Sequence, residues 1–108
     1  RWVSAIVGMK VETPDGALIG RVRNVVVDGY GVASFAIVSY GSVMRSSVRY
    51  TAVPWATVAE LLVKDRLVVD RSNLQNAPLV LSEKPELRDG NWRHDAESYW
   101  NGRVAVAQ

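Results

Sequence analysis

The chain has 108 residues, enough for one domain with a single modest core, and 48% hydrophobic and 22% charged residues, an ordinary balance for a globular protein. It contains no cysteine, which excludes disulfides, thiolate nucleophiles and cysteine metal sites together. The net charge at pH 7 is only +2, and acids are scattered among the basic residues, so the charge pattern argues against a nucleic-acid-binding protein.

The first two thirds of the chain are rich in valine, isoleucine, tyrosine and threonine, interrupted by regular turn signals, and this predicts a small all-β sandwich or barrel. A first strand is expected over residues 7–13, followed by a tight turn at the Pro-Asp-Gly of 14–16. The segment 17–28 is too long for a flat strand. Its apolar positions change parity around Gly20, which predicts a bulge or bend there.

A second hairpin turn is expected at 28–31 and a strand over 32–40, with apolar residues on both of its faces. A strand of this kind lies centrally in a sheet or under a covering element. The polar segment 41–47 reads as a loop. A fourth strand over 49–53 ends at Pro54, because proline cannot donate a hydrogen bond to the strand ladder.

For the segment 55–60 we expect a short turn. Two further strands, over 61–63 and 67–70, would then flank the charged turn at 64–66. The alternative is a helix over 55–62, which the alanine, valine and leucine residues of this segment permit.

The composition changes after residue 70. We therefore predict a β domain over 3–70 and a C-terminal extension over 71–108. Ser72 can cap a short helix, and an irregular arm is expected over 79–89.

A last helix is expected after Asn91, which can cap it. Trp92, Ala96 and Tyr99 are spaced so that they share one face of this helix. Gly102 is placed to end it.

The glycines between the first strands could be a phosphate-binding loop or turns. A phosphate loop needs its glycines between a strand and a helix N-terminus, together with a lysine and a serine or threonine. Here the glycines lie between strand and strand, which favours turns and bends. These residues are Gly16, Gly20, Gly29 and Gly31.

No residue pattern indicates catalysis or metal binding. His94 is the only histidine, and its neighbours Asp95 and Glu97 lie in a predicted surface helix. Without a second histidine or a cysteine, a zinc or iron site would be built mostly from carboxylates, which is uncommon. Acid pairs such as Asp65 and Asp70 are explained by hairpin tips and helix caps. We expect no enzyme activity, no cofactor and no metal site.

Binding of RNA would require arginines to converge beside Tyr40 or Tyr50, so that charge and base stacking act together. No alternation of aromatic and basic residues marks such a platform, and nucleic acid is the less favoured partner. The arginines in question are Arg21, Arg23, Arg45 and Arg49.

The tryptophans suggest a protein partner, because large aromatic side chains are enriched where an apolar patch meets another protein. The alternative is that Trp92 and Tyr99 fold the tail back onto its own barrel, and the sequence leaves both open. The predicted interaction surface comprises Tyr40, Met44, Trp55, Trp92, Tyr99 and Trp100.

Four motifs follow one another along residues 6–70: IVGMKV, PDGALIGRVRNVVVDGYGVASFAIVSYG, TAVPW and LVVD. In this order and spacing the chain resembles the PRC-barrel family, named for the cytoplasmic domain of the photosynthetic reaction-centre H subunit. The tail is similar to that of small stand-alone bacterial members, with NAP at 76–78, a tryptophan-containing arm and YW at 99–100.

The resemblance implies a small, strongly bent antiparallel β-barrel, here with a C-terminal arm and a short helix. It also implies an assembly role, as in the reaction centre or in a ribosome maturation factor that binds a ribosomal protein. The loop GSVMRSS at 41–47 departs from the glycine-rich apolar loop common in the family. We expect a non-enzymatic protein–protein interaction module that forms a homodimer, with an RNA- or ribosome-associated barrel as the alternative.

No apolar run approaches the ~20 residues of a membrane-spanning helix, so we expect no membrane span in this chain. A cytoplasmic location is the expectation. The chain begins at Arg1 rather than at methionine, so we expect a segment upstream of it, and an exported or anchored form is the alternative.

Overall fold

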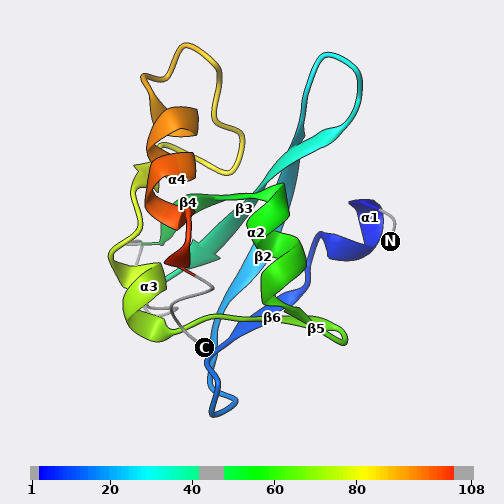
Figure 1. Ribbon diagram of the computed structural model, residues 1–108, viewed down its shortest axis with the longest axis vertical. Helices are drawn as coiled ribbons and strands as arrows, with labels where there is room; N and C mark the ends of the chain where they lie inside the picture. Colours follow the sequence, from blue (N-terminus) through cyan, green and yellow to red (C-terminus); the bar gives the residue numbers. More distant parts are fainter. Residues whose placement is uncertain (1–2, 42–47, 104–108) are drawn as a thin grey trace.

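The computed structural model describes residues 3–41 and 48–103, and these ranges contain seven strands and four short helices (Figure 1). The strands are β1 (Lys10–Glu12), β2 (Leu18–Val27), β3 (Ala33–Tyr40), β4 (Arg49–Pro54), β5 (Leu62–Val63), β6 (Arg66–Val68) and β7 (Leu79–Val80). The helices are α1 (Val3–Ile6), α2 (Trp55–Leu61), α3 (Arg71–Gln75) and α4 (Trp92–Trp100). The predicted β fold with a C-terminal arm and helix is confirmed.

The strands form one sheet in the order β5-β6-β1-β2-β3-β4-β7. Within the described ranges the sheet is not closed, and its edges are the two-residue strands β5 and β7. All pairings are antiparallel, as predicted, except that β1 and β6 run parallel, with Val11 opposite Leu67. The parallel pair arises because α2 and β5 carry the chain across the sheet from β4, so that β6 reaches the β1 edge in the same direction as β1.

The long strand β2 is irregular where the sequence predicted a bend. Its pairing with β1 steps from Gly20 to Leu18 and leaves Ile19 without a partner residue. A second register shift lies at Arg23, in the pairing with β3. Gly20 has a further role, because a Cβ atom at this position would overlap the carbonyl oxygen of Ser39. The glycine lets β2 and β3 approach closely as well as bend.

The central strand β3 is buried on both faces, as predicted: every residue from Phe35 to Tyr40 is buried. Successive side chains of a strand point to opposite faces, so β3 contributes to two cores. The main core contains Ala36, Val38 and Tyr40 together with Val22, Val53, Leu67 and Trp100. The second core contains Phe35 and Ile37 together with Ala52, Val80, Trp92 and Ala96.

The hairpin turn between β2 and β3 is the one predicted at 28–31. The Asp28 carboxylate accepts hydrogen bonds from the backbone N–H groups of Tyr30 and Val32, at 2.8 and 3.0 Å. Gly31 adopts a φ of 77°, which favours glycine. These local contacts fix the turn without help from the rest of the chain.

The expected turn at 55–60 is wrong, and the alternative is right: this segment forms α2. Thr57, Val58 and Leu61 are its buried residues, and the helix packs against β3 and β4. Burial of this face stabilises a helix that intrinsic propensity alone leaves undecided. The strands that follow are β5 and β6, each shorter than the predicted strand.

The C-terminal extension packs on its own sheet. After α3, the first residues of the expected arm form β7, which pairs with β4 by placing Val80 opposite Tyr50. Helix α4 then packs against β4 and buries Trp92 and Trp100. Of the two placements considered for the tail, folding back onto its own barrel is the one observed. The boundary predicted at residue 70 stays a prediction.

The two predicted helix caps are only partly right. Helix α3 begins two residues earlier than expected and follows Asp70, so Ser72 is not its N-cap. Asn91 does precede α4, but its side chain makes no capping hydrogen bond. Gly102, with a φ of 79°, follows the last helical turn as predicted.

Candidate functional site

The six residues predicted as an interaction surface lie in different environments. Trp55 and Tyr99 are half-buried, and Met44 lies outside the described residues. The remaining three are buried within the chain, at 7%, 5% and 2% exposure: Tyr40, Trp92 and Trp100. A partner that leaves this fold intact would not touch these three, so an interaction surface has to draw on other side chains as well.

Exposed apolar side chains occur at one end of the molecule, where the tip of the β2–β3 hairpin and the arm before α4 project in the same direction (Figure 1). Tyr30, at the hairpin tip, is 93% exposed. Leu81 and Leu87 in the arm are 78% and 73% exposed, and Val27 and Val32 beside the tip are exposed too. We call these five side chains the apolar end. The sequence signal for it is Tyr30 itself, an aromatic residue between the two glycines of a hairpin turn.

Hydrogen bonds tie the arm to β2 and to α4. The Asn24 side-chain amide of β2 donates a hydrogen bond to the Glu83 carbonyl at 2.8 Å. The Trp92 indole N–H donates to the Glu86 carbonyl, also at 2.8 Å, and the Glu86 backbone N–H donates to the Asp89 carboxylate. These bonds hold the arm beside the hairpin, so that both parts of the apolar end have a fixed place.

A pocket of about 530 Å³ lies where β2 begins and β3 ends, at the open end of the hairpin. Leu18, Ile19 and Leu74 supply apolar lining. No aspartate or glutamate occurs among the described residues that line it. The basic lining residues are Arg21 and Arg23 from β2, Arg49 from β4 and Arg71 from α3. We call it the arginine pocket.

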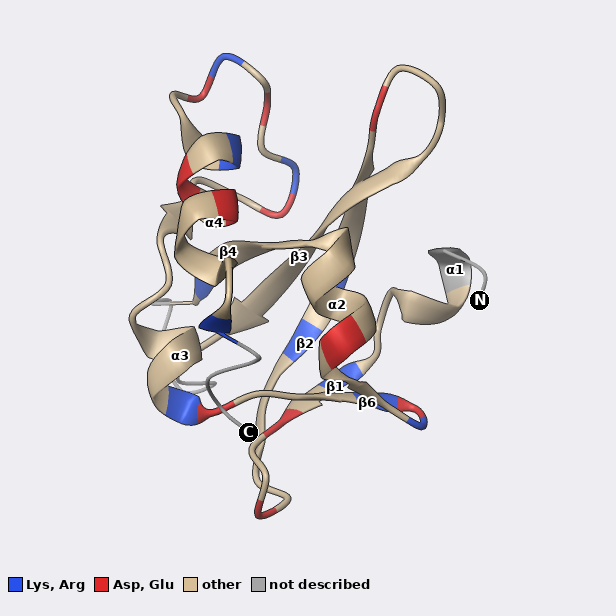
Figure 2. Cartoon of the chain, in the orientation of Figure 1, with Lys and Arg blue, Asp and Glu red and all other residues tan. Residues whose placement is uncertain are grey.

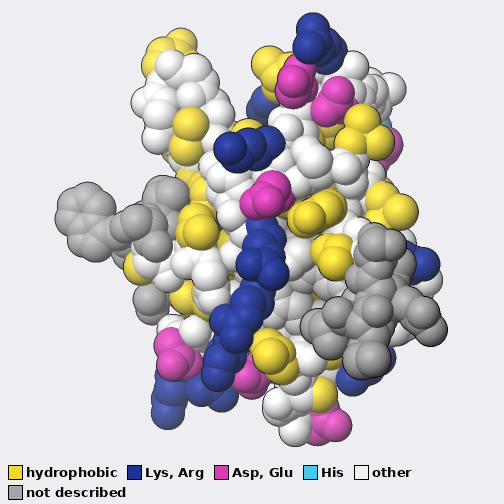
Figure 3. All heavy atoms as spheres, turned by 180° about the vertical axis from the view of Figure 1, so that it is seen from behind, with side chains coloured by type: hydrophobic (Ala, Val, Ile, Leu, Met, Phe, Trp, Pro, Cys, Tyr) yellow, Lys and Arg dark blue, Asp and Glu magenta, His cyan; other side chains and the backbone are white. Residues whose placement is uncertain are grey.

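Two of these arginines are oriented by hydrogen bonds. Arg23 donates from Nε to the Ser39 hydroxyl at 2.9 Å, and Arg21 donates from Nη1 to the Gly8 carbonyl at 3.1 Å. Within residues 3–41 and 48–103, no ion pair joins any arginine of the pocket to a carboxylate. Figure 2 shows basic residues on β2 and on α3, and Figure 3 shows a face on which Lys and Arg side chains form a column between apolar ones.

Tyr40 also lines the arginine pocket, and its hydroxyl has no hydrogen-bond partner among the described residues. Burial raises the pKa of this hydroxyl above its usual value of 10.0, and the charge of Arg49 opposes the shift. The two residues lie directly opposite each other in the β3–β4 register, so their side chains share one face of the sheet. The pocket therefore has positive charge on the face of the sheet that carries this buried tyrosine.

We expect stability to fall at alkaline pH. Burial raises the pKa of Tyr40, and burial also raises that of Tyr99, opposed there by Arg103. A raised pKa in the folded state means that the stabilising contribution is complete below about pH 10 and is lost as the pH rises through the folded-state pKa. Guanidinium unfolding at about pH 9 and about pH 11 measures the loss. The loss of stability between these two pH values should be smaller in a Tyr40→Phe/Tyr99→Phe variant than in the parent. It should be the same as in the parent in Tyr30→Phe, which changes an exposed tyrosine at the hairpin tip. An equal loss in the parent and both variants would contradict this assignment.

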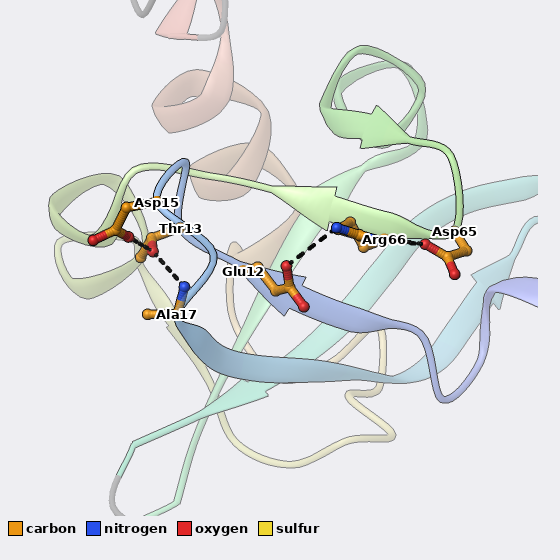
Figure 4. Close-up of polar contacts among 6 residues, drawn as sticks. All are labelled: Glu12, Thr13, Asp15, Ala17, Asp65 and Arg66. Carbon is orange, nitrogen blue, oxygen red and sulfur yellow. Dashed lines mark hydrogen bonds and ion pairs between the residues drawn. The ribbon is translucent and has the colours of Figure 1, made fainter.

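One acid considered for acid–base chemistry, Asp65, has a structural partner, as do Glu12 and Asp15 (Figure 4). Arg66 lies between Asp65 and Glu12, with N–O distances of 3.0 and 3.7 Å, and its hydrogen bond and charge lower the pKa of Asp65. The Thr13 hydroxyl donates to the Asp15 carboxylate, which lowers the pKa of Asp15. Among the described residues, no three His, Cys, Asp or Glu side chains are grouped to hold a metal ion.

No helix within the described ranges is long and apolar enough to cross a membrane.

The fold and these sites define a small, β-rich module. The sequence model of the PRC-barrel domain matches residues 3–75, more than half of the chain. The chain therefore belongs to the PRC-barrel family, and the resemblance drawn from the four motifs is confirmed. The comparison with curated proteins gave no match.

Proposed function

We propose that this chain is a non-enzymatic protein–protein interaction module that associates with a second copy of itself through the apolar end. The observation that carries the proposal is the 93% exposure of Tyr30 on a projecting hairpin, with exposed valines beside the tip and exposed leucines in the arm that projects in the same direction (Figure 1). Burying such side chains removes apolar surface from water, which favours association. Tyrosine is also among the residue types that contribute most to binding at interfaces.

The charges of the arm support self-association. Glu83 and Glu86 alternate with Lys84 and Arg88, and the Arg88–Glu86 pair is joined at 2.8 Å. In a two-fold dimer the same surface meets itself, so a surface with one sign of charge would repel its copy. An arm with both signs can face its own copy without this repulsion.

The absence of catalysis is supported by the direction of the pKa shifts. Among the described groups whose pKa departs from its usual value, both aspartates shift downward and both tyrosines upward. A general acid or base works best with a pKa near the operating pH. None of these shifts moves a group toward neutrality, and each has the structural cause described above.

Sedimentation equilibrium tests the dimer. We expect the parent chain to be dimeric at ~100 μM, and a Tyr30→Ser/Leu81→Ser variant to dissociate about tenfold more readily or worse, because it removes two exposed apolar contacts. The matched control is Val63→Ser, on the edge strand β5, which should dimerise like the parent. A parent chain that stays monomeric at ~100 μM, or a Tyr30 variant that dimerises normally, would contradict self-association through this surface.

The alternative, an RNA- or ribosome-associated barrel, is favoured by one observation: Arg21, Arg23 and Arg49 line a single pocket. Arg45 lies outside the described residues. Stacking of RNA bases on Tyr40 or Tyr50 lacks support, because the Tyr40 ring is buried and Tyr50 packs against the second core. RNA binding would weaken steeply with salt, as phosphate contacts release counterions. An RNA whose gel mobility is unchanged by the protein at low salt would count against it.

A further inference from the structure

The described lining of the arginine pocket is positively charged, and the carboxylate that interacts electrostatically with one of its arginines, Asp15 with Arg71, is not part of that lining. Over the whole sequence, 13 basic residues are nearly balanced by 11 acids. The described lining of the pocket has four arginines and no acid. Like charges brought together without counterions repel one another, so the arrangement favours an anion that comes from outside the chain.

The guanidinium groups retain donors for such an anion. Arginine has five N–H donors in a rigid, planar fork, which suits the paired oxygens of carboxylates and phosphates. Arg23 uses only its Nε in the bond to Ser39, and Arg21 uses only one terminal nitrogen in the bond to Gly8. Both side chains are held on the Ser39 face of the sheet by one bond each, and within residues 3–41 and 48–103 their remaining N–H groups make no further hydrogen bond.

The Tyr40 hydroxyl is an independent observation that points to a ligand. It is buried and has no partner among the described residues, although buried polar groups are nearly always hydrogen-bonded. The other buried polar atom without a partner in the described ranges is Trp100 Nε1, and Trp100 does not line the pocket. An anion bound beside Arg49 would offer an acceptor oxygen on the face of the sheet that carries Tyr40.

We propose that the arginine pocket binds a small molecule that carries carboxylate or phosphate groups on a partly apolar frame. The pocket, at about 530 Å³, has the size of a small-molecule site. Leu18, Ile19 and Leu74 contact the frame, while Arg71 and Arg49, which shares a face of the sheet with Tyr40, bind the charged groups. This site lies at the open end of the hairpin and is independent of the apolar end at its tip.

Isothermal titration calorimetry tests the proposal with two probes, citrate for carboxylates and pyrophosphate for phosphates, at constant ionic strength set with sodium chloride. We expect at least one probe to bind with a dissociation constant below about 1 mM. Binding of citrate alone identifies a carboxylate site, and binding of pyrophosphate alone identifies a phosphate site. Arg49→Gln and Arg71→Gln, both at exposed positions, should each weaken binding about tenfold.

Two further variants separate binding from folding. Arg88→Gln removes the same charge from the exposed arm and should bind like the parent. Tyr40→Phe removes a hydroxyl that has no described partner, so its melting temperature should equal or exceed that of the parent while its affinity for the probe falls several-fold.

Three outcomes would overturn the proposal. The first is no heat of binding with either probe at several millimolar. The second is parent-like affinity in an Arg49→Gln/Arg71→Gln double variant. The third is tight binding of a uridine 12-mer that depends on these arginines and that neither probe displaces, which would make the pocket part of an RNA-binding surface instead.

Discussion

Replacing Trp92 by alanine is expected to lower the free energy of unfolding by about 3–5 kcal/mol, as is usual for a large aromatic side chain removed from a core. The Trp92 ring is 5% exposed and meets the Phe35 ring edge-on, with centroids 5.1 Å apart. Its indole N–H also donates to the Glu86 carbonyl at 2.8 Å. Guanidinium unfolding followed by circular dichroism measures the change.

The control is His94→Ala, an exposed position on the same helix, which should change stability by no more than about 0.5 kcal/mol. Trp92→Phe should lie between the two, because it keeps a ring against Phe35 and loses the bond to Glu86. A loss below about 1 kcal/mol for Trp92→Ala would contradict the packing of α4 on the sheet. A large loss means that the C-terminal extension completes the second core and cannot be removed without exposing Phe35.

The parts of the fold that depend on local contacts were predictable. The turn at 28–31 follows from an Asp-Gly step, whose carboxylate binds two backbone N–H groups within four residues of it. The burial of β3 on both faces follows from apolar residues at consecutive positions, which no half-exposed strand would carry. Neighbouring hairpins then fix most of the sheet order.

The parts that depend on distant contacts were not predictable. The sequence of residues 55–61 favours a turn and permits a helix, and the burial of Val58 and Leu61 against strands from elsewhere in the chain stabilises the helix. The parallel pairing of β1 with β6 joins segments more than fifty residues apart, such as Lys10 and Arg66. No local signal specifies such a partner.

The candidate sites, like the fold, have features that the sequence predicts and features that depend on distant contacts. The sequence shows that Trp92 and Trp100 are large and apolar, but not that their own chain covers them. It places Arg21 and Arg23 on one parity of a strand, whereas Arg71 enters the same pocket from a helix some fifty residues away. Composition identifies side chains that need burial or a counterion, and only the tertiary fold shows which of them remain without one.

Gly20→Ala is expected to destabilise the protein by about 1–3 kcal/mol, because the new methyl group would overlap the Ser39 carbonyl oxygen, which is backbone and can move only with β3. Gly29→Ala is the matched control: a Cβ there meets nothing within 4 Å, so unfolding should be unchanged or slightly harder. Because the Ser39 hydroxyl holds Arg23, the Gly20 variant should also disturb the arginine pocket. Denaturant midpoints of the two variants measure the effect, and equal midpoints would refute the close approach of β2 and β3 at Gly20.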